Sequence, residues 1–267
     1  MAACGGHRTA ARHGRSATGG DPNPVVFGGR LVSIGGGRSL YLKCQGSGSP
    51  TVILEAGVGA GSDDWSEVQP RLARATRTCA YDRAGLGNSL PVLGSLPFPA
   101  VHHASDDVSD LERLLDHAAI TTPYVLVGRS YGGLLVRLFA HARPHRTAGM
   151  VLVDARALDA KLGGLGDTPL VIITPGRPID SGPPVPARVQ RLVERRWATM
   201  QDQLAGLSSD HLHVIALRSG HVVQRSLNGQ PDVVIAAVLA VLNAARTRTP
   251  LPPCPTLFHR PGVQCRS

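Results

Sequence analysis

A serine flanked by glycines follows a short apolar run near the middle of the chain. Residues 124–128 read YVLVG, and the chain continues as Arg-Ser130-Tyr-Gly-Gly. The run is typical of a buried strand, and the residues after it have the spacing of an amphipathic helix. A serine on a tight strand-to-helix turn has a strained backbone, and glycines two positions away relieve the crowding. Such a turn exposes the hydroxyl for attack on a carbonyl carbon, so Ser130 is a predicted nucleophile.

A glycine-rich loop follows an earlier strand-like run, VILEA. It reads Gly57-Val-Gly-Ala-Gly61 and continues with Ser62. Glycines in such a loop allow a ligand to approach backbone N–H groups closely. A dinucleotide loop is the alternative, because Gly57-x-Gly59 follows a strand. The third glycine of that fingerprint is missing, since Ser62 occupies its place. We therefore favour an anion-stabilising loop over a dinucleotide site.

Two more motifs follow strand-like runs. Asp82-Arg-Ala-Gly-Leu-Gly comes after residues 77–81, which end in Tyr81, and Ser-Gly-His221 comes after residues 212–217. In order and spacing, the motifs LEAG, YDRAGLG, GxSYGG and SGH resemble the α/β-hydrolase superfamily over residues 25–245. The similarity is strongest to its bacterial esterase-like members.

The resemblance implies roles for particular residues. Ser130 is the nucleophile, and His221 takes its proton and returns it to the leaving group. The backbone N–H groups of Val58 and Tyr131 form the oxyanion hole. Asp82 has a structural role in its turn. The resemblance implies no cofactor, and the partner is a small-molecule acyl substrate.

The acid that orients His221 has two candidates. The order serine, acid, histidine places it between residues 131 and 220. Asp154 directly closes the run 149–153, whereas Asp180 lies farther out in the loop GRPIDSGPP. The superfamily uses both positions. We favour Asp154, because it follows its strand without intervening residues, and Asp180 is the alternative acid.

The chain departs from its relatives at two places. Arg129 stands where they usually have histidine, at a position expected to point away from the site with little effect. Only residues 155–168 lie between Asp154 and Pro169, where the relatives carry a longer helical lid. This length is near the minimum for a crossover between parallel strands. We expect a minimal or absent lid and a shallow site.

The surrounding pattern predicts an α/β-hydrolase fold, with a mostly parallel eight-stranded sheet flanked by helices. The domain is expected at 25–246, between a disordered tail at 1–24 and a proline-rich tail at 247–267. The first two strands are expected to form an antiparallel hairpin. The expected strands are 30–34, 39–44, 51–55, 77–81, 124–128, 149–153, 169–174 and 212–217. The expected helices are 64–74, 105–118, 131–143, 156–163, 186–206 and 231–245.

Composition excludes several other classes of protein. The net charge is +9, but the excess of arginine lies largely in the terminal segments, so we expect no nucleic-acid partner. No apolar run is long enough for a membrane span. His211 and His213 share a strand face without a third ligand nearby, so we expect no metal. The oligomeric state is left open.

Five cysteines raise the question of redox state. By the superfamily's strand order, the second and fourth strands are antiparallel neighbours, which brings Cys44 close to Cys79, within reach of a disulfide. No secretory signal is recognised, so we expect a cytoplasmic protein with reduced thiols at these positions.

The expected function is a serine esterase-like hydrolase that cleaves a small carboxylic ester, or a related acyl compound, through an acyl-enzyme intermediate. A non-catalytic binding protein with the same fold is one alternative. An acyltransferase with the same catalytic triad is another. The identity and chain length of the substrate depend on pocket shape, which the fold alone does not determine.

Overall fold

The computed structural model describes residues 1, 25–26, 28–89, 103–156, 162–177 and 186–266. Ten strands form one sheet in the order β1-β2-β3-β5-β4-β6-β7-β8-β9-β10. The strands are β1 Val25–Val26, β2 Gly29–Gly35, β3 Arg38–Gln45, β4 Thr51–Glu55, β5 Thr78–Tyr81, β6 Tyr124–Arg129, β7 Thr147–Val153, β8 Leu170–Pro175, β9 His211–Ala216 and β10 Val263–Arg266.

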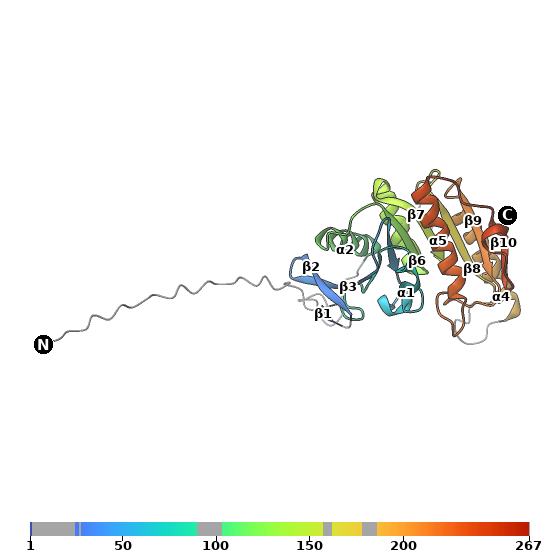
Figure 1. Cartoon of the computed structure of the whole chain (residues 1–267). Helices are drawn as coiled ribbons and strands as arrows, with labels where there is room; N and C mark the ends of the chain where they lie inside the picture. Colours follow the sequence, from blue (N-terminus) through green and yellow to red (C-terminus); the bar gives the residue numbers. More distant parts are fainter. Residues whose placement is uncertain (2–24, 27, 90–102, 157–161, 178–185, 267) are drawn as a thin grey trace.

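Helices cover both faces of the sheet (Figure 1). Side chains alternate along β4, so Val52 and Leu54 pack in one apolar cluster and Ile53 in the other. The first cluster includes residues of α1 and α5, and the second includes residues of α2, α3 and α4. The helices are α1 Gln69–Leu72, α2 Ala104–His117, α3 Tyr131–Ala142, α4 Ala187–Ala205, α5 Pro231–Thr247 and α6 Cys254–Leu257, with short 3₁₀ helices η1 Ser62–Trp65 and η2 Pro144–Arg146.

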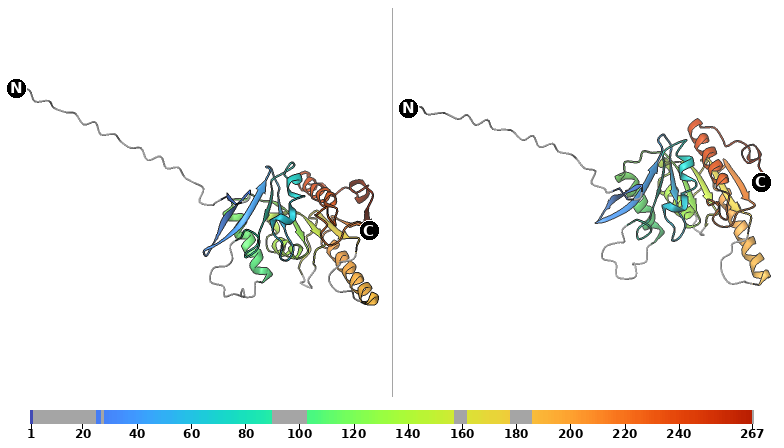
Figure 2. Two further views of the ribbon diagram at one scale, coloured as in Figure 1. Left: turned by 90° about the horizontal axis from the view of Figure 1, so that it is seen from below. Right: turned by 60° about the horizontal axis from the view of Figure 1, so that its bottom comes forward.

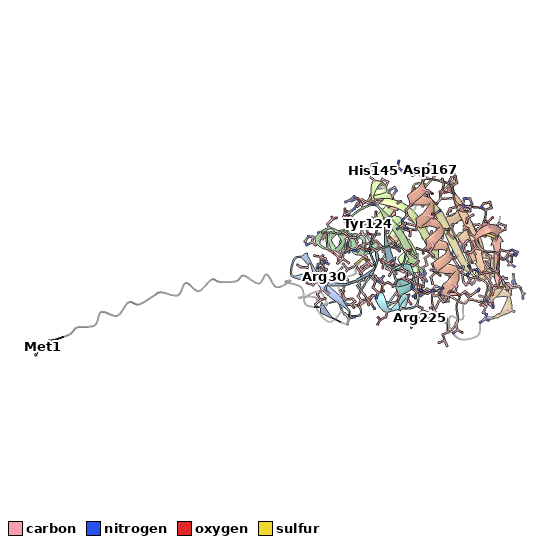
Figure 3. All side chains as sticks on the ribbon, in the orientation of Figure 1. Met1, Arg30, Tyr124, His145, Asp167 and Arg225 are labelled. Atoms are coloured by element: carbon pink, nitrogen blue, oxygen red, sulfur yellow. A yellow bond between two sulfur atoms is a disulfide. The ribbon has the colours of Figure 1, made fainter. Side chains whose placement is uncertain are left out.

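Strands β5, β4 and β6 to β9 are mutually parallel, and this fixes where the polar loops gather. Their carboxyl ends lie along one edge of the sheet. In Figure 3, His145 and Asp167, which precede β7 and β8, lie at the top of the molecule. Arg225, in the loop after β9, lies at the bottom. The lower edge of the sheet in this view is therefore the carboxyl edge.

The predicted α/β-hydrolase architecture is confirmed, with two corrections to the elements. The eight expected strands are β2 to β9, and β2 and β3 form the expected antiparallel hairpin. The edge strands β1 and β10 raise the number to ten. The predicted helix 64–74 is split into η1 and α1. Most of the predicted helix 156–163 lies outside the described residues.

The C-terminal segment is the second correction, because it was expected to form no regular element. It contains α6 and β10, and β10 pairs antiparallel with β9. Leu251 and Phe258 are buried. The prolines hid this structure in the sequence, but all of them precede the four residues of β10, so the N–H groups of that edge strand remain free to pair.

Two disulfides correct the expectation of reduced thiols. Cys44 of β3 faces Cys79 of β5 across antiparallel strands, at a Cα separation of 4.0 Å, and the two are bonded. The predicted strand order is thus confirmed. Cys254 and Cys265, with Cα atoms 5.9 Å apart, form a second bond that sequence analysis missed. Disulfides persist in oxidising compartments, so both bonds argue against the predicted cytoplasmic location.

None of the described helices is long and apolar enough to cross a membrane.

Removing each disulfide should destabilise the fold. We expect a loss of about 3–4 kcal/mol for Cys44→Ala with Cys79→Ala, which open a longer loop, and about 2–3 kcal/mol for Cys254→Ala with Cys265→Ala. Urea unfolding of the two double variants measures this. Mass spectrometry of alkylated, unreduced protein gives the pairing directly, and alkylation of all four cysteines would contradict it.

Candidate active site

Ser130 occupies the turn between β6 and α3. Its φ angle is 52°, a conformation that is unfavourable for a residue with a side chain, and its N–H donates to the Val153 carbonyl at 3.0 Å. A Cβ atom on Gly128 would lie 2.5 Å from the Gly132 carbonyl oxygen. A Cβ atom on Gly132 would lie 2.4 Å from the Glu55 carbonyl oxygen. The glycines therefore permit the close approach of α3 to β4 and β6 that forms this strained turn.

Asp154 follows β7, the strand beside β6. The residue is fully buried, with a φ angle of 43°. Its Oδ2 atom is hydrogen-bonded to His221 Nδ1, and Trp197 Nε1 donates to its Oδ1 atom at 2.7 Å. The structure thus brings Asp154 and His221 together, one strand away from Ser130. The alternative acid, Asp180, lies outside the described residues.

His221 lies in the loop after β9 and is about one-third exposed. The loop around it is fixed by backbone contacts. The Gly220 N–H donates to the Asn228 carbonyl at 2.9 Å, and the Ser219 carbonyl accepts from the Arg177 N–H at 2.9 Å. One ring nitrogen of His221 faces the buried carboxylate of Asp154, so the other is free to act as a base. Serine, acid and histidine all follow carboxyl ends of parallel strands.

The expected oxyanion donors lie at the same edge. Tyr131 is the first residue of α3, where a backbone N–H has no acceptor within its own helix. Val58 lies in the glycine-rich loop after β4, and the residue is 71% exposed. The two residues before Val58 are held by Arg83. Its guanidinium donates to the Ala56 carbonyl at 2.8 Å and also to the Gly57 carbonyl. The loop carrying Val58 is therefore fixed by a side chain from the β5 end.

A buried polar cluster supports Arg83. The Glu55 carboxyl group, 1% exposed, accepts hydrogen bonds from Arg83 and from the Tyr81 hydroxyl. Burial raises the pKa of Glu55 to about 7, against the opposing effect of the nearby Arg83 charge. The Arg83 guanidinium lies 5.4 Å from the ring centroid of Tyr131, whose hydroxyl donates to Asp107 at 2.9 Å. Arg83 therefore contacts both the loop that carries Val58 and Tyr131, the residue after Ser130.

Asp82 organises the neighbouring turn. Its carboxylate accepts from the backbone N–H groups of Ser62, at 2.5 Å, and Asn88, at 2.7 Å. A Cβ atom on Gly61 or Gly87 would collide with it. These contacts account for the DRAGLG motif structurally, as expected from the sequence.

Arg129 forms a largely buried ion pair that the sequence did not predict. Its Nε atom donates to Asp64 at 2.7 Å, and the side chains of the pair are 8% and 12% exposed. A Cβ atom on Gly57 would lie 2.5 Å from an Arg129 guanidinium nitrogen. This side chain therefore packs against the loop that carries Val58, and the expectation of little effect stays a prediction. The pair is 65 residues apart in sequence, and no local pattern reveals it.

The described histidines do not suggest a metal centre. His213 is buried and its Nε2 atom lies 2.8 Å from the Thr174 hydroxyl. Burial lowers its pKa to about 4, against the opposing charge of Asp202. Within the described ranges, no group of three or more histidine, cysteine or acidic side chains is placed to hold a metal ion.

Comparison with known proteins identifies a related family over part of the chain. A family described as "alpha/beta hydrolase fold" matches residues 50–176, which include β4, the Val58 loop, Ser130 and Asp154. The chain therefore has the α/β-hydrolase fold and resembles that family over nearly half of its length. The uncharacterized protein YqjL of Bacillus subtilis is 25% identical over 238 residues, covering 75% of this chain and 87% of that protein.

Other curated relatives match over shorter stretches. A 2-hydroxy-6-oxo-2,4-heptadienoate hydrolase of Pseudomonas putida is 34% identical over 139 residues, covering 50% of this chain and 47% of that enzyme. A probable transporter of Hormonema carpetanum is 36% identical over 131 residues, 46% of this chain, but the match spans only 18% of that protein. The chain thus spans half or less of the length of these two relatives.

Solved structures show the same fold. A thermophilic esterase from Thermogutta terrifontis has a TM-score of 0.61 at 16% identity, covering 81% of this chain and 98% of that one. A meta-cleavage product hydrolase from Pseudomonas fluorescens has a TM-score of 0.61 at 15% identity, covering 80% and 97%. At these identities the likeness shows the fold alone.

The Arg129–Asp64 pair gives a prediction for this site. Asp64→Asn leaves a largely buried guanidinium without its partner and should lower the free energy of unfolding by about 3 kcal/mol. The control is Glu112→Gln, which breaks the more exposed pair with Arg143 and should cost no more than about 1 kcal/mol. Urea unfolding compares the two, and equal losses would contradict the structural role of Arg129.

Proposed function

We propose that this protein is a serine hydrolase that cleaves a small carboxylic ester, or a related acyl compound, through an acyl-enzyme intermediate. One observation carries the proposal. The Asp154–His221 hydrogen bond lies at the same sheet edge as Ser130, which sits in a strained turn. Strained backbone persists where the surrounding structure enforces it, and it is frequent at reactive residues.

The proposed reaction has two half-reactions. His221 takes the Ser130 proton as Oγ attacks the carbonyl carbon, and Asp154 stabilises the charged imidazole. The Val58 and Tyr131 N–H groups stabilise the oxyanion. His221 then gives the proton to the leaving alcohol, and the acyl-enzyme forms. Water attacks that ester with His221 as base, and the carboxylic acid is released as Ser130 regains its proton.

The first prediction separates catalysis from a non-catalytic binding role. The wild-type chain should react with a fluorophosphonate probe and hydrolyse p-nitrophenyl acetate, and Ser130→Ala should abolish both without unfolding the protein. Probe labelling and far-ultraviolet circular dichroism measure this. Labelling that survives in Ser130→Ala would sink the nucleophile assignment, and an unreactive wild type would favour the binding role. Product analysis with added alcohol distinguishes hydrolysis from acyl transfer.

The second prediction tests the acid. Asp154→Asn removes the charge that stabilises the imidazolium, so kcat should fall by about 10³–10⁴-fold. Asp180→Asn should be nearly silent and serves as the matched control. Steady-state kinetics on one p-nitrophenyl ester measures both variants. A large loss in Asp180→Asn with a small loss in Asp154→Asn would transfer the role to Asp180.

The third prediction concerns the acyl group. A cleft of about 340 Å³ lies between α4 and the ends of β8 and β9, and its apolar lining includes Val193, Trp197 and Ile215. This volume is at the small end for ligand pockets. Neither Ser130 nor His221 lines this cleft, so the expectation of short acyl chains rests on the short crossover at 155–168. A panel of p-nitrophenyl esters should show kcat/KM falling with chain length, and a steady rise through about ten carbon atoms would contradict it.

A further inference from the structure

Helix α4 is anchored to the body by one end. It extends away from the sheet in both views of Figure 2, where it is the amber helix near residue 200. Val189 and Leu192, in its first half, are 45% and 59% exposed. Gln201 and Leu204, in its second half, are buried. The second half of α4 is therefore the part that is fixed against the body of the protein.

Two side chains one turn apart on α4 hold the residues that follow β7. Trp197 Nε1 donates to Asp154 Oδ1 at 2.7 Å, and Gln201 Nε2 donates to the Ala155 carbonyl at 2.8 Å. Residues four apart share a helix face, so both side chains reach the same short segment. One bond fixes the carboxylate, and the other fixes the backbone immediately after it.

Asp154 needs these hydrogen bonds because its backbone is strained and its carboxylate is buried. Its φ angle of 43° is unfavourable, and its carboxylate is fully buried. A buried carboxylate requires hydrogen-bond donors, and His221 supplies a donor to Oδ2 only. The Trp197 N–H serves Oδ1 and so fixes which oxygen faces the imidazole.

We propose that α4 positions the acid of the catalytic triad, with Trp197 and Gln201 as positioning residues. The inference rests on the proposed function for its kinetic consequences. It assigns a role to a helix that none of the sequence motifs includes. The hydrogen bond from Trp197 holds the carboxylate rotamer, and the hydrogen bond from Gln201 holds the strained backbone.

Kinetics tests the role with matched variants. Trp197→Phe keeps an aromatic ring but removes the N–H, and kcat should fall about tenfold or more with KM nearly unchanged, since a hydrogen bond to a charged group is lost. Gln201→Met should also lower kcat. Gln203→Met makes the same change at an exposed position of α4 and should not. Unchanged kcat in Trp197→Phe, or equal effects of the two methionine variants, would overturn the proposal.

A spectroscopic readout separates this inference from the proposed function. The chain has only two tryptophans, and the Trp65 indole N–H is buried without a partner. In wild-type protein with ¹⁵N-labelled indoles, the Trp197 N–H resonance, assigned by its loss in Trp197→Phe, should shift with pH at the His221 midpoint. The Trp65 resonance should stay constant.

Failure of the proposed function and failure of the positioning role give different results. If the wild type is inactive toward probe and esters, the proposed function fails, and the titration alone decides the role of Trp197. If the wild type is active but the Trp197 resonance ignores the His221 titration, the positioning role fails and the proposed function stands.

Discussion

Parallel pairing of β6 with β7 brings the carboxyl ends of both strands to one edge of the sheet, with Arg129 opposite Val153. Ser130 and Asp154 are the next residues on each strand, so the proposed nucleophile and acid become neighbours through backbone register alone. Both have positive φ angles, and the Ser130 N–H is bonded to the Val153 carbonyl. The strain at each residue persists because packing around the sheet leaves no room for relaxation. The rest of the proposed site depends on this register.

Buried charged side chains fix the glycine-rich loop that follows β4. A loop that presents backbone N–H groups to a ligand cannot satisfy them internally, so it must be fixed by its carbonyl groups and by its neighbours. Arg83 donates to two carbonyls, those of Ala56 and Gly57, and also to the Glu55 carboxyl group. Arg129 also packs against Gly57. Arg129 at the end of β6 and Arg83 in the loop after β5 therefore hold one loop, and this arrangement pre-organises the proposed oxyanion hole.

Local patterns in the sequence were sufficient for much of this fold. Apolar runs, glycine spacing and motif order predicted eight strands, and they placed Asp154 and His221 where the structure joins them. Contacts distant in sequence were not predictable in the same way. Trp197 meets Asp154 across 43 residues, and Arg129 meets Asp64 across 65. Strand β10 was missed because four residues after a proline-rich stretch carry too weak a signal.

The most direct test of the central claim is a crystal structure of the chain after reaction with a fluorophosphonate. The account predicts a covalent bond from Ser130 Oγ to phosphorus. The phosphoryl oxygen should lie about 3 Å from the backbone nitrogens of Val58 and Tyr131, with His221 still bonded to Asp154. An adduct on another residue, or a phosphoryl oxygen pointing away from both N–H groups, would contradict a single catalytic centre at this sheet edge.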